Sequence, residues 1–150
     1  MFLKTLAPTW GITVVRVMMG VILVVACWEK INAGGLFGFV PAITNFGFPA
    51  PQVLGVFIPL LEGIGGLLIL VGLGARWVSV LFICEFAVNV FILKATRQPP
   101  FGGWDSMRID LMILAGSIMV LIAGPGELAL ENVWLRRRGS QRMATAVQYR

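Results

Sequence analysis

Three charged side chains lie inside long apolar stretches of this chain. Glu62 lies in the middle of residues 53–73, which contain no other charge, and Glu85 and Arg16 lie in two further stretches of the same kind. At the centre of a bilayer an ionisable group costs roughly 3 kcal/mol or more unless a partner or water stabilises it. These residues are therefore the first candidates for proton transfer or for binding a ligand.

The three groups are expected to meet in one shared interior. With a rise of ~1.5 Å per residue and the N-terminus inside, Arg16 lies roughly 8 Å and Glu85 roughly 12 Å from the inner edge, while Glu62 lies roughly 14 Å from the outer edge. A guanidinium binds carboxylates through paired hydrogen bonds, so we expect Arg16 to hold Glu62, Glu85 or both. Asn89 follows Glu85 by one helical turn and completes the candidate site.

Two interpretations of this cluster stay open. The first is a buried ion-pair network that only sets how the helices pack. The second is a proton-carrying site or the polar end of a ligand pocket. Two carboxylates facing one arginine leave one acid in excess, and we expect that acid to be protonated or to bind a cation or a polar ligand.

A second polar cluster lies toward the outer ends of the apolar stretches. Its members are Glu29, Lys30, Asp105, Arg108 and Asp110. Solvated charges at the membrane interface are the expected explanation for this outer-edge cluster. Asp110 starts an apolar run, and its place at a helix N-terminus favours a negative charge.

Long apolar helices must position these groups. Of the 150 residues, 58% are hydrophobic, compared with about 45–50% in ordinary soluble domains. Four spans of predominantly apolar residues are predicted at about 11–28, 53–73, 77–93 and 109–123, with tryptophans near their ends. The predicted fold class is all-α: an integral membrane four-helix bundle over residues 1–135, followed by a basic cytoplasmic tail over residues 136–150.

The distribution of positive charge predicts the orientation. Lysine and arginine are in excess on the side that holds both ends of the chain, so both termini are expected in the cytoplasm of a multi-pass protein of the bacterial inner membrane. The net charge of +5 is concentrated beyond the last span, where contact with anionic lipid explains it better than nucleic-acid binding.

The connection at residues 31–52 is unusually apolar. It contains no charged residue, but it does contain four phenylalanines and three prolines. We expect either a short helix lying in the outer interface or a lid folded over a pocket that is open to lipid.

The chain shows no electron carrier of its own. It has no histidine, which is the usual haem and zinc ligand, and its two cysteines form no C-x-x-C pair. No metal site and no covalently bound cofactor are predicted, so electrons for any redox chemistry would have to come from a partner.

The chain resembles the DoxX family (DoxX/DoxD-like) of small bacterial membrane proteins. The resemblance covers roughly residues 15–131. It rests on these motifs in order: RVMMG at 16–20, Lys30, FGFP at 46–49, EGIGG at 62–66, VGLGAR at 71–76 and GPG at 124–126. It implies a four-helix membrane bundle. It also implies a link to quinone and redox chemistry, since some relatives are subunits of quinone-linked thiosulfate oxidation and others are partners in membrane oxidoreductase complexes for oxidative-stress defence.

Three functions follow from the residues and the resemblance together. The first is a membrane subunit that binds a lipophilic ligand, with a quinone as the candidate, and works with a soluble or membrane redox protein. The second is a non-enzymatic scaffold or assembly subunit. The third, ranked last, is a small proton-coupled transporter, because four short spans leave little room for alternating access unless the protein forms a homo-oligomer. Whether the chain itself is an enzyme stays open.

Overall fold

All regular structure in the described residues is helical, as predicted. The computed structural model describes residues 3–95, 104–126 and 128–131, and side chains within residues 10–95, 104, 107–126 and 128–131. The predicted basic tail lies outside these ranges. The helices are α1 (Leu3–Gly34), α2 (Val40–Asn45), α3 (Pro51–Leu60), η1 (Leu61–Gly65), α4 (Gly66–Val71), α5 (Ala75–Ala87), η2 (Val88–Lys94) and α6 (Trp104–Ala123).

Three of the helical segments are long and apolar enough to cross a membrane. They are Trp10–Gly34, Pro51–Val71 and Ala75–Lys94. Helices α3, η1 and α4 form one continuous rod, and α5 continues directly into η2. The protein is therefore a multi-pass membrane protein. The four tryptophans expected near the ends of the spans, Trp10, Trp28, Trp77 and Trp104, all have exposed side chains.

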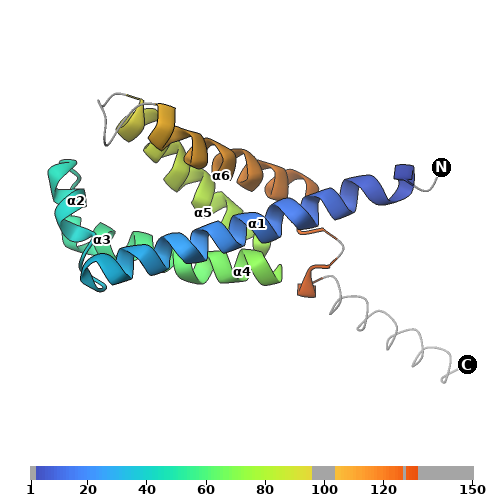
Figure 1. The fold of residues 1–150 in the computed structure, drawn as a ribbon, viewed down its shortest axis with the longest axis horizontal. Coiled ribbons are helices and arrows are strands. Elements are labelled where there is room, and N and C mark those ends of the chain that lie inside the picture. Colours follow the sequence, from blue (N-terminus) through green and yellow to red (C-terminus); the bar gives the residue numbers. More distant parts are fainter. Residues whose placement is uncertain (1–2, 96–103, 127, 132–150) are drawn as a thin grey trace, which may run out of the picture.

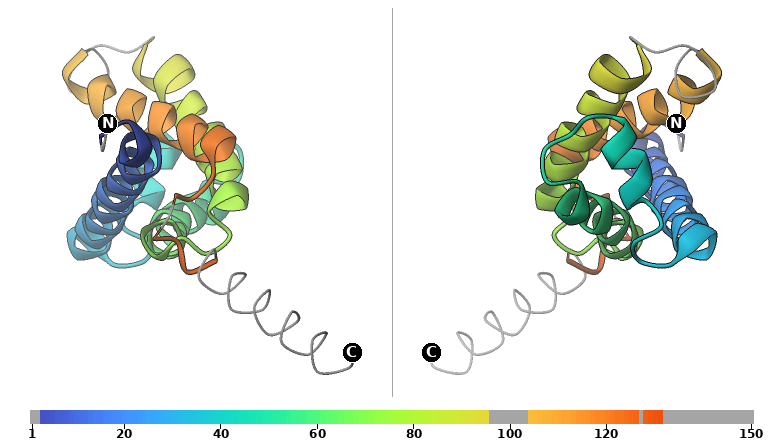
Figure 2. Two further views of the ribbon diagram at one scale, coloured as in Figure 1. Left: turned by 90° about the vertical axis from the view of Figure 1, so that its right-hand side faces the viewer. Right: turned by 90° about the vertical axis from the view of Figure 1, so that its left-hand side faces the viewer.

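The long helices form two arms that meet at one end. The first arm contains α1 packed along α3, η1 and α4, and the second contains α5 and η2 packed along α6. Figure 1 shows the two arms side by side near the turn between α4 and α5, and separated toward the end that carries α2. In Figure 2, the view from that end places α2 in front of the space between the arms.

Glycines allow the backbones of the first arm to approach closely. A Cβ on Gly20 would lie 2.9 Å from the carbonyl oxygen of Gly66 and 2.9 Å from the Cα of Leu70. A Cβ on Gly66 would in turn lie 2.9 Å from the Cβ of Leu23. Small residues at a crossing are the usual means of close helix packing in membranes, where apolar side chains gain little from leaving lipid.

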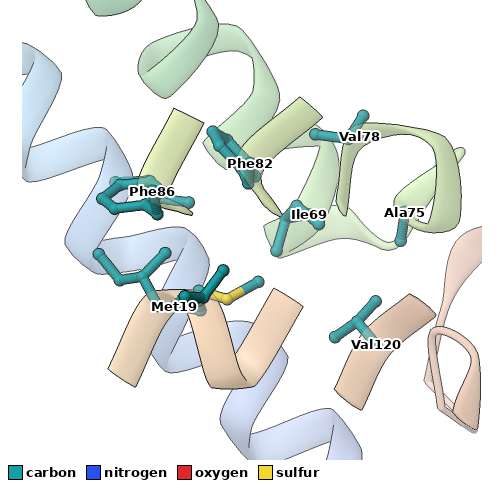
Figure 3. Packing of buried hydrophobic residues seen from close by; sticks show 10 residues of the cluster. Met19, Ile69, Ala75, Val78, Phe82, Phe86 and Val120 are labelled. Carbon is teal, nitrogen blue, oxygen red and sulfur yellow. The ribbon is translucent and has the colours of Figure 1, made fainter. Parts of the chain in front are cut away.

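An apolar core fills the end where the arms meet. It contains Met19, Leu23, Ile69, Ala75, Val78, Phe82, Phe86, Ile113, Leu114 and Val120, which come from both arms. Figure 3 shows side chains from α1, α4, α5 and α6 pointing toward one another in this core. The rings of Phe82 and Phe86 are tilted by 57° with their centroids 6.1 Å apart, which is a favourable aromatic geometry.

Helix α1 is longer than the predicted first span. It continues through Glu29 and Lys30 and ends at Gly34, where Gly35 adopts a positive φ of 71°. No residue between Trp28 and Gly34 interrupts a helix, so the charged pair does not terminate it. The prediction that the first span closes at residues 29 and 30 is therefore wrong, and Lys30 lies within α1.

The apolar connection contains a short helix, and its place in the outer interface stays a prediction. Helix α2 begins with a proline in its first turn and buries Ile43, which is 2% exposed. It packs against α3 at Gly55, where an added Cβ would lie 2.6 Å from Cγ2 of Val40. The tight contact holds α2 across the space between the arms.

Two π-helical turns interrupt the spans. Turn η1 follows Pro59, which has no N–H to donate and weakens the regular hydrogen-bond ladder. Turn η2 forms the last seven residues of the third span. A π-helical turn accommodates one extra residue, which turns the following side chains by about 100° around the helix axis. Both turns carry polar residues: Glu62 in η1, and Asn89 and Lys94 in η2.

Candidate functional site

A largely apolar cavity of about 640 Å³ lies between the two arms, beside α2. Its walls come from α1, α3, η1, α5, η2, α6 and the segment around α2. Five phenylalanines contribute to them: Phe39, Phe46, Phe48, Phe57 and Phe86. Ligand pockets in proteins typically measure 300–1,000 Å³ and are apolar with a few polar groups, so the cavity has the size and wall composition of a ligand pocket.

The first polar feature of the cavity is an ion pair within the first arm. The Lys30 ammonium donates to Oε2 of Glu62, and both residues line the cavity. The Glu62 side chain is 4% exposed and that of Lys30 is 24% exposed. The ammonium also lies 5.1 Å from the centroid of the Phe39 ring, a cation–π contact that links α1 to the segment before α2.

The second polar feature is a carboxyl group that the protein leaves without a hydrogen bond. Both carboxyl oxygens of Glu85 are buried, and neither has a hydrogen-bond partner among the described residues. Glu85 lines the cavity together with Asn89, and it lies within electrostatic range of Glu62, Lys30 and Asp110. A buried polar atom without a partner costs about 1–3 kcal/mol, so this carboxyl gains from any ligand atom that pairs with it.

The third polar feature is an ion pair in the second arm. The Lys94 ammonium lies 2.8 Å from Oδ2 of Asp110, and both residues line the cavity. The pair joins η2 to α6. Each arm therefore brings its own ion pair to the cavity, and Glu85 is the additional acid.

Arg16 lies outside this cavity, which corrects the predicted pairing. It is 2% exposed, its Nη2 donates to the carbonyl oxygen of Leu128 at 3.5 Å, and its Nη1 occupies the space where Gly72 would carry a Cβ. Glu62 is bound by Lys30 instead. Fourteen positions of α1 separate Arg16 from Lys30, which is ~21 Å along a helix, so a single arginine side chain cannot reach the acid.

The surroundings of Arg16 explain why a cation is stable there. Helix α4 ends at Val71, and Gly72 closes it with a positive φ of 78°. The unpaired carbonyl groups at a helix C-terminus carry partial negative charge. Arg16 therefore lies against the negative end of α4 and beneath the segment that follows α6, and it ties the two together. Its Nε and Nη1 have no hydrogen-bond partner within the described part of the chain.

Comparison with known proteins decides the family. The model of the DoxX family matches residues 11–95, which is more than half of the chain. The chain belongs to the DoxX family. A Bacillus subtilis (strain 168) protein named "Putative oxidoreductase CatD" is 30% identical over 121 residues, which cover 81% of this chain and 84% of that protein. No solved structure matches the chain.

The DoxX match covers one part of the site more fully than the other. Residues 11–95 include Lys30, Glu62, Glu85, Asn89 and Lys94, so the first ion pair and the unpaired acid lie inside the matched region. Asp110, the partner of Lys94, lies on α6 beyond it.

The outer-edge cluster predicted from the sequence divides into two groups in the DoxX fold. Lys30 and Asp110 turn into the cavity and form ion pairs, whereas Glu29 and Arg108 have exposed side chains. The side chain of Asp105 lies outside the described residues. The exposed positions of Glu29 and Arg108 fit the expected charges at the membrane interface, whereas the two residues that line the cavity do not.

Lys94 is the cavity residue that reasoning from the sequence missed. The predicted third span ends at about residue 93, but the helix continues to Lys94 through η2. A signal was present in the sequence, since Lys94 and Asp110 stand at facing ends of consecutive apolar stretches and carry opposite charge.

Proposed function

We propose that this DoxX family protein is a membrane subunit that binds a quinone-type ligand in the cavity between its arms. The observation that supports the proposal most directly is the buried, unpaired carboxyl of Glu85 in an otherwise largely apolar, phenylalanine-rich cavity. A quinone has a flat apolar ring and carbonyl oxygens that accept hydrogen bonds, and this wall composition suits both. The name of the Bacillus subtilis relative, an oxidoreductase, is in line with the same chemistry.

Different residues of the cavity would contact the ring and the carbonyl oxygens of such a ligand. Phenylalanine side chains would contact the ring, with Phe57 on the first arm and Phe86 on the second. Glu85 would donate a hydrogen bond to a carbonyl oxygen, and the Lys30 ammonium, fixed by Glu62, would stabilise negative charge on the ring. A bound quinone supplies two-electron, two-proton redox chemistry, and the electrons would come from a partner redox protein.

The proposed setting is the bacterial inner membrane, with a four-helix bundle and both termini in the cytoplasm. Helix α6 would form the fourth span, since its 20 residues extend over ~30 Å, about the thickness of the hydrocarbon core. In this orientation the α2 end of the cavity faces outward, and Arg16 lies near the cytoplasmic side.

Thermal unfolding with a short-chain ubiquinone analogue tests the ligand. At a concentration 100 times its Kd, a ligand stabilises the folded state by about 2.7 kcal/mol, which raises Tm by roughly 5–10 °C for a chain of this size. We expect that increase in wild type and a much smaller one in Glu85→Gln. Glu29→Gln is the matched control, because Glu29 is exposed and does not line the cavity. An equal increase in Glu85→Gln, or none in wild type, contradicts the proposal.

A scaffold without ligand chemistry is the second candidate, and the Arg16 contacts favour it. Arg16 joins α1, the end of α4 and the backbone of Leu128 without touching the cavity. If scaffolding is the whole function, Arg16→Gln should weaken a partner complex while Glu85→Gln leaves it intact. The comparison is made by co-purification in mild detergent, and loss of the complex's activity in Glu85→Gln alone would exclude the scaffold.

A further inference from the structure

The charged groups of the cavity gather toward one of its ends. The ion pairs Lys30–Glu62 and Lys94–Asp110 belong to the half in which the arms separate and α2 lies between them. Lys94 is the last residue of η2, and Lys30 lies four residues before the end of α1. Polar side chains therefore extend from the α2 end of the bundle to the depth of Glu85.

The packed core forms an apolar floor where it meets the cavity. Leu23, Phe86 and Ile113 line the cavity and also belong to the packed core; they are 0%, 3% and 4% exposed. One comes from α1, one from α5 and one from α6. Met19 and Phe82 belong to the same packed core, part of which Figure 3 shows.

Within the described part of the chain, the buried serines of the core do not belong to the cavity lining. Ser79 and Ser117 are both 0% exposed. The hydroxyl of Ser79 donates to the carbonyl oxygen of Ala75 at 2.7 Å, and that of Ser117 lies 3.6 Å from the sulfur of Met19. Each hydroxyl has its own hydrogen-bond partner, and neither lines the cavity with Glu85.

Glu85 is an acid in excess of the two ion pairs that line the cavity. The charged residues that line the cavity are Lys30 from α1, Glu62 from η1, Lys94 from η2 and Asp110 from α6, and the Cys84 thiol lies next to Glu85 on α5. Each ammonium is paired with a carboxylate. Glu85 keeps both oxygens without a partner among the described residues.

We propose that Glu85 is the proton-exchanging residue of the cavity and that it exchanges protons only with the α2 side of the membrane. This inference rests on the proposed function, because the reduction of a quinone-type ligand consumes protons. In the exchange the O–H bond of the Glu85 carboxyl breaks as water accepts the proton, and a new O–H bond forms when water returns one. Asn89 and Lys94 follow Glu85 by roughly 6 and 13 Å along the helix and lead toward the α2 end.

Labelling of the native Cys84 thiol shows from which side of the membrane a water-soluble reagent reaches the cavity. Cys84 lines the cavity and is exposed, whereas Cys27 is buried. A membrane-impermeant cationic methanethiosulfonate is applied to wild-type protein in right-side-out and in inside-out vesicles. Two marker variants in a Cys84→Ser background define the sides: Phe37→Cys, which precedes α2, and Leu73→Cys, in the turn between α4 and α5.

The labelling pattern decides the route. The proposal expects Cys84 to react in the vesicles in which the Phe37→Cys marker reacts, at a rate at least tenfold above that in the opposite vesicles. Reaction from the Leu73→Cys side, or from neither side while the permeant N-ethylmaleimide reacts, overturns it. The assay needs no quinone, so it can fail while the thermal shift succeeds, and the reverse also holds.

A lipophilic carbodiimide identifies the acid. Dicyclohexylcarbodiimide adds a protonated carboxyl group across its C=N bond, so a carboxyl oxygen bonds to the carbodiimide carbon and the proton moves to nitrogen. We expect the adduct, located by mass spectrometry of peptides, on Glu85, with Glu62 protected by Lys30. Glu85→Gln should remove it and Glu29→Gln should not. An adduct on Glu62 in place of Glu85, or on neither, overturns the assignment.

Discussion

The ion pair between Lys30 and Glu62 makes a quantitative prediction about stability. In Lys30→Met the carboxylate, whose side chain is 4% exposed, loses its ammonium partner while an apolar side chain of similar length remains. Removing one partner of a buried pair costs about 3–5 kcal/mol. We expect a smaller loss, ~1 kcal/mol, for Glu62→Gln, because the Lys30 ammonium is partly exposed and keeps its contact with the Phe39 ring.

Protonation of the stranded acid limits the loss in Lys30→Met. Neutralising a carboxylate costs ~1.4 kcal/mol for each pH unit above the ordinary glutamate pKa of ~4.3. The stability lost in Lys30→Met can therefore not exceed about 3.7 kcal/mol at pH 7 and about 1 kcal/mol at pH 5. The folded variant then holds one proton more than its unfolded state. Its stability should therefore fall as the pH rises through this window, while wild type changes less.

Reversible unfolding in mixed micelles, followed by circular dichroism at pH 5 and pH 7, measures these free energies. The double variant Lys30→Met/Glu62→Gln removes the stranded acid and should lose the pH dependence, with a coupling energy of ~2 kcal/mol between the two sites. Glu29→Gln, one residue away and exposed, should stay within about 0.5 kcal/mol of wild type. The reasoning is refuted if Lys30→Met loses the same amount at both pH values, or if the two substitutions are additive.

Two glycine substitutions test the packing of the first arm by the same unfolding measurement. Gly72→Ala should lower the free energy of unfolding by about 3 kcal/mol or more, because the new Cβ would overlap the Arg16 guanidinium. Gly74→Ala is the control: Gly74 shares the positive φ but has no neighbour within 4 Å, so the loss should be ~1 kcal/mol. Equal losses in the two variants would count against the Arg16 contact. Gly20→Ala should lower the free energy of unfolding by about 1–3 kcal/mol, because the new Cβ forces α1 away from α4. Gly11→Ala is the control: the new Cβ meets nothing within 4 Å, so the substitution should stabilise the helix by about 0.5–1 kcal/mol. A neutral Gly20→Ala would show that the crossing of α1 and α4 is looser than described.

Reasoning from the sequence identified two acids of the site, Glu62 and Glu85, but not the partner of Glu62. Glu62 and Glu85 are candidates because they stand within apolar stretches, and Asn89 because it follows Glu85 by one helical turn; all three line the cavity. Arg16 was selected by the same rule and lies elsewhere, at the end of α4. A polar residue in an apolar span must find a buried partner, but hydropathy does not say which one.

Two local features of the backbone decided the pairing. Helix α1 continues past its last apolar run, which places Lys30 opposite η1, and η1 follows a proline inside the second span. A π-helical turn rotates the following residues by about 100°, so it changes which face of a helix points inward. Such a rotation depends on contacts with other helices and leaves no clear periodic signal.

What the sequence by itself determined is the environment and the class of the protein. Long apolar runs can satisfy the hydrogen bonds of their backbone in lipid as helices, so the helical membrane fold follows from hydropathy. The ordered short motifs indicate the DoxX family, whose model matches residues 11–95. Only the tertiary structure decided that Lys30 rather than Arg16 binds Glu62, that Lys94 and Asp110 form a second pair, and that Glu85 has no partner among the described residues. The physical reason is that ion pairs depend on the axial offset and the rotation of neighbouring helices, and these are set by close packing such as the contact of Gly20 with Gly66.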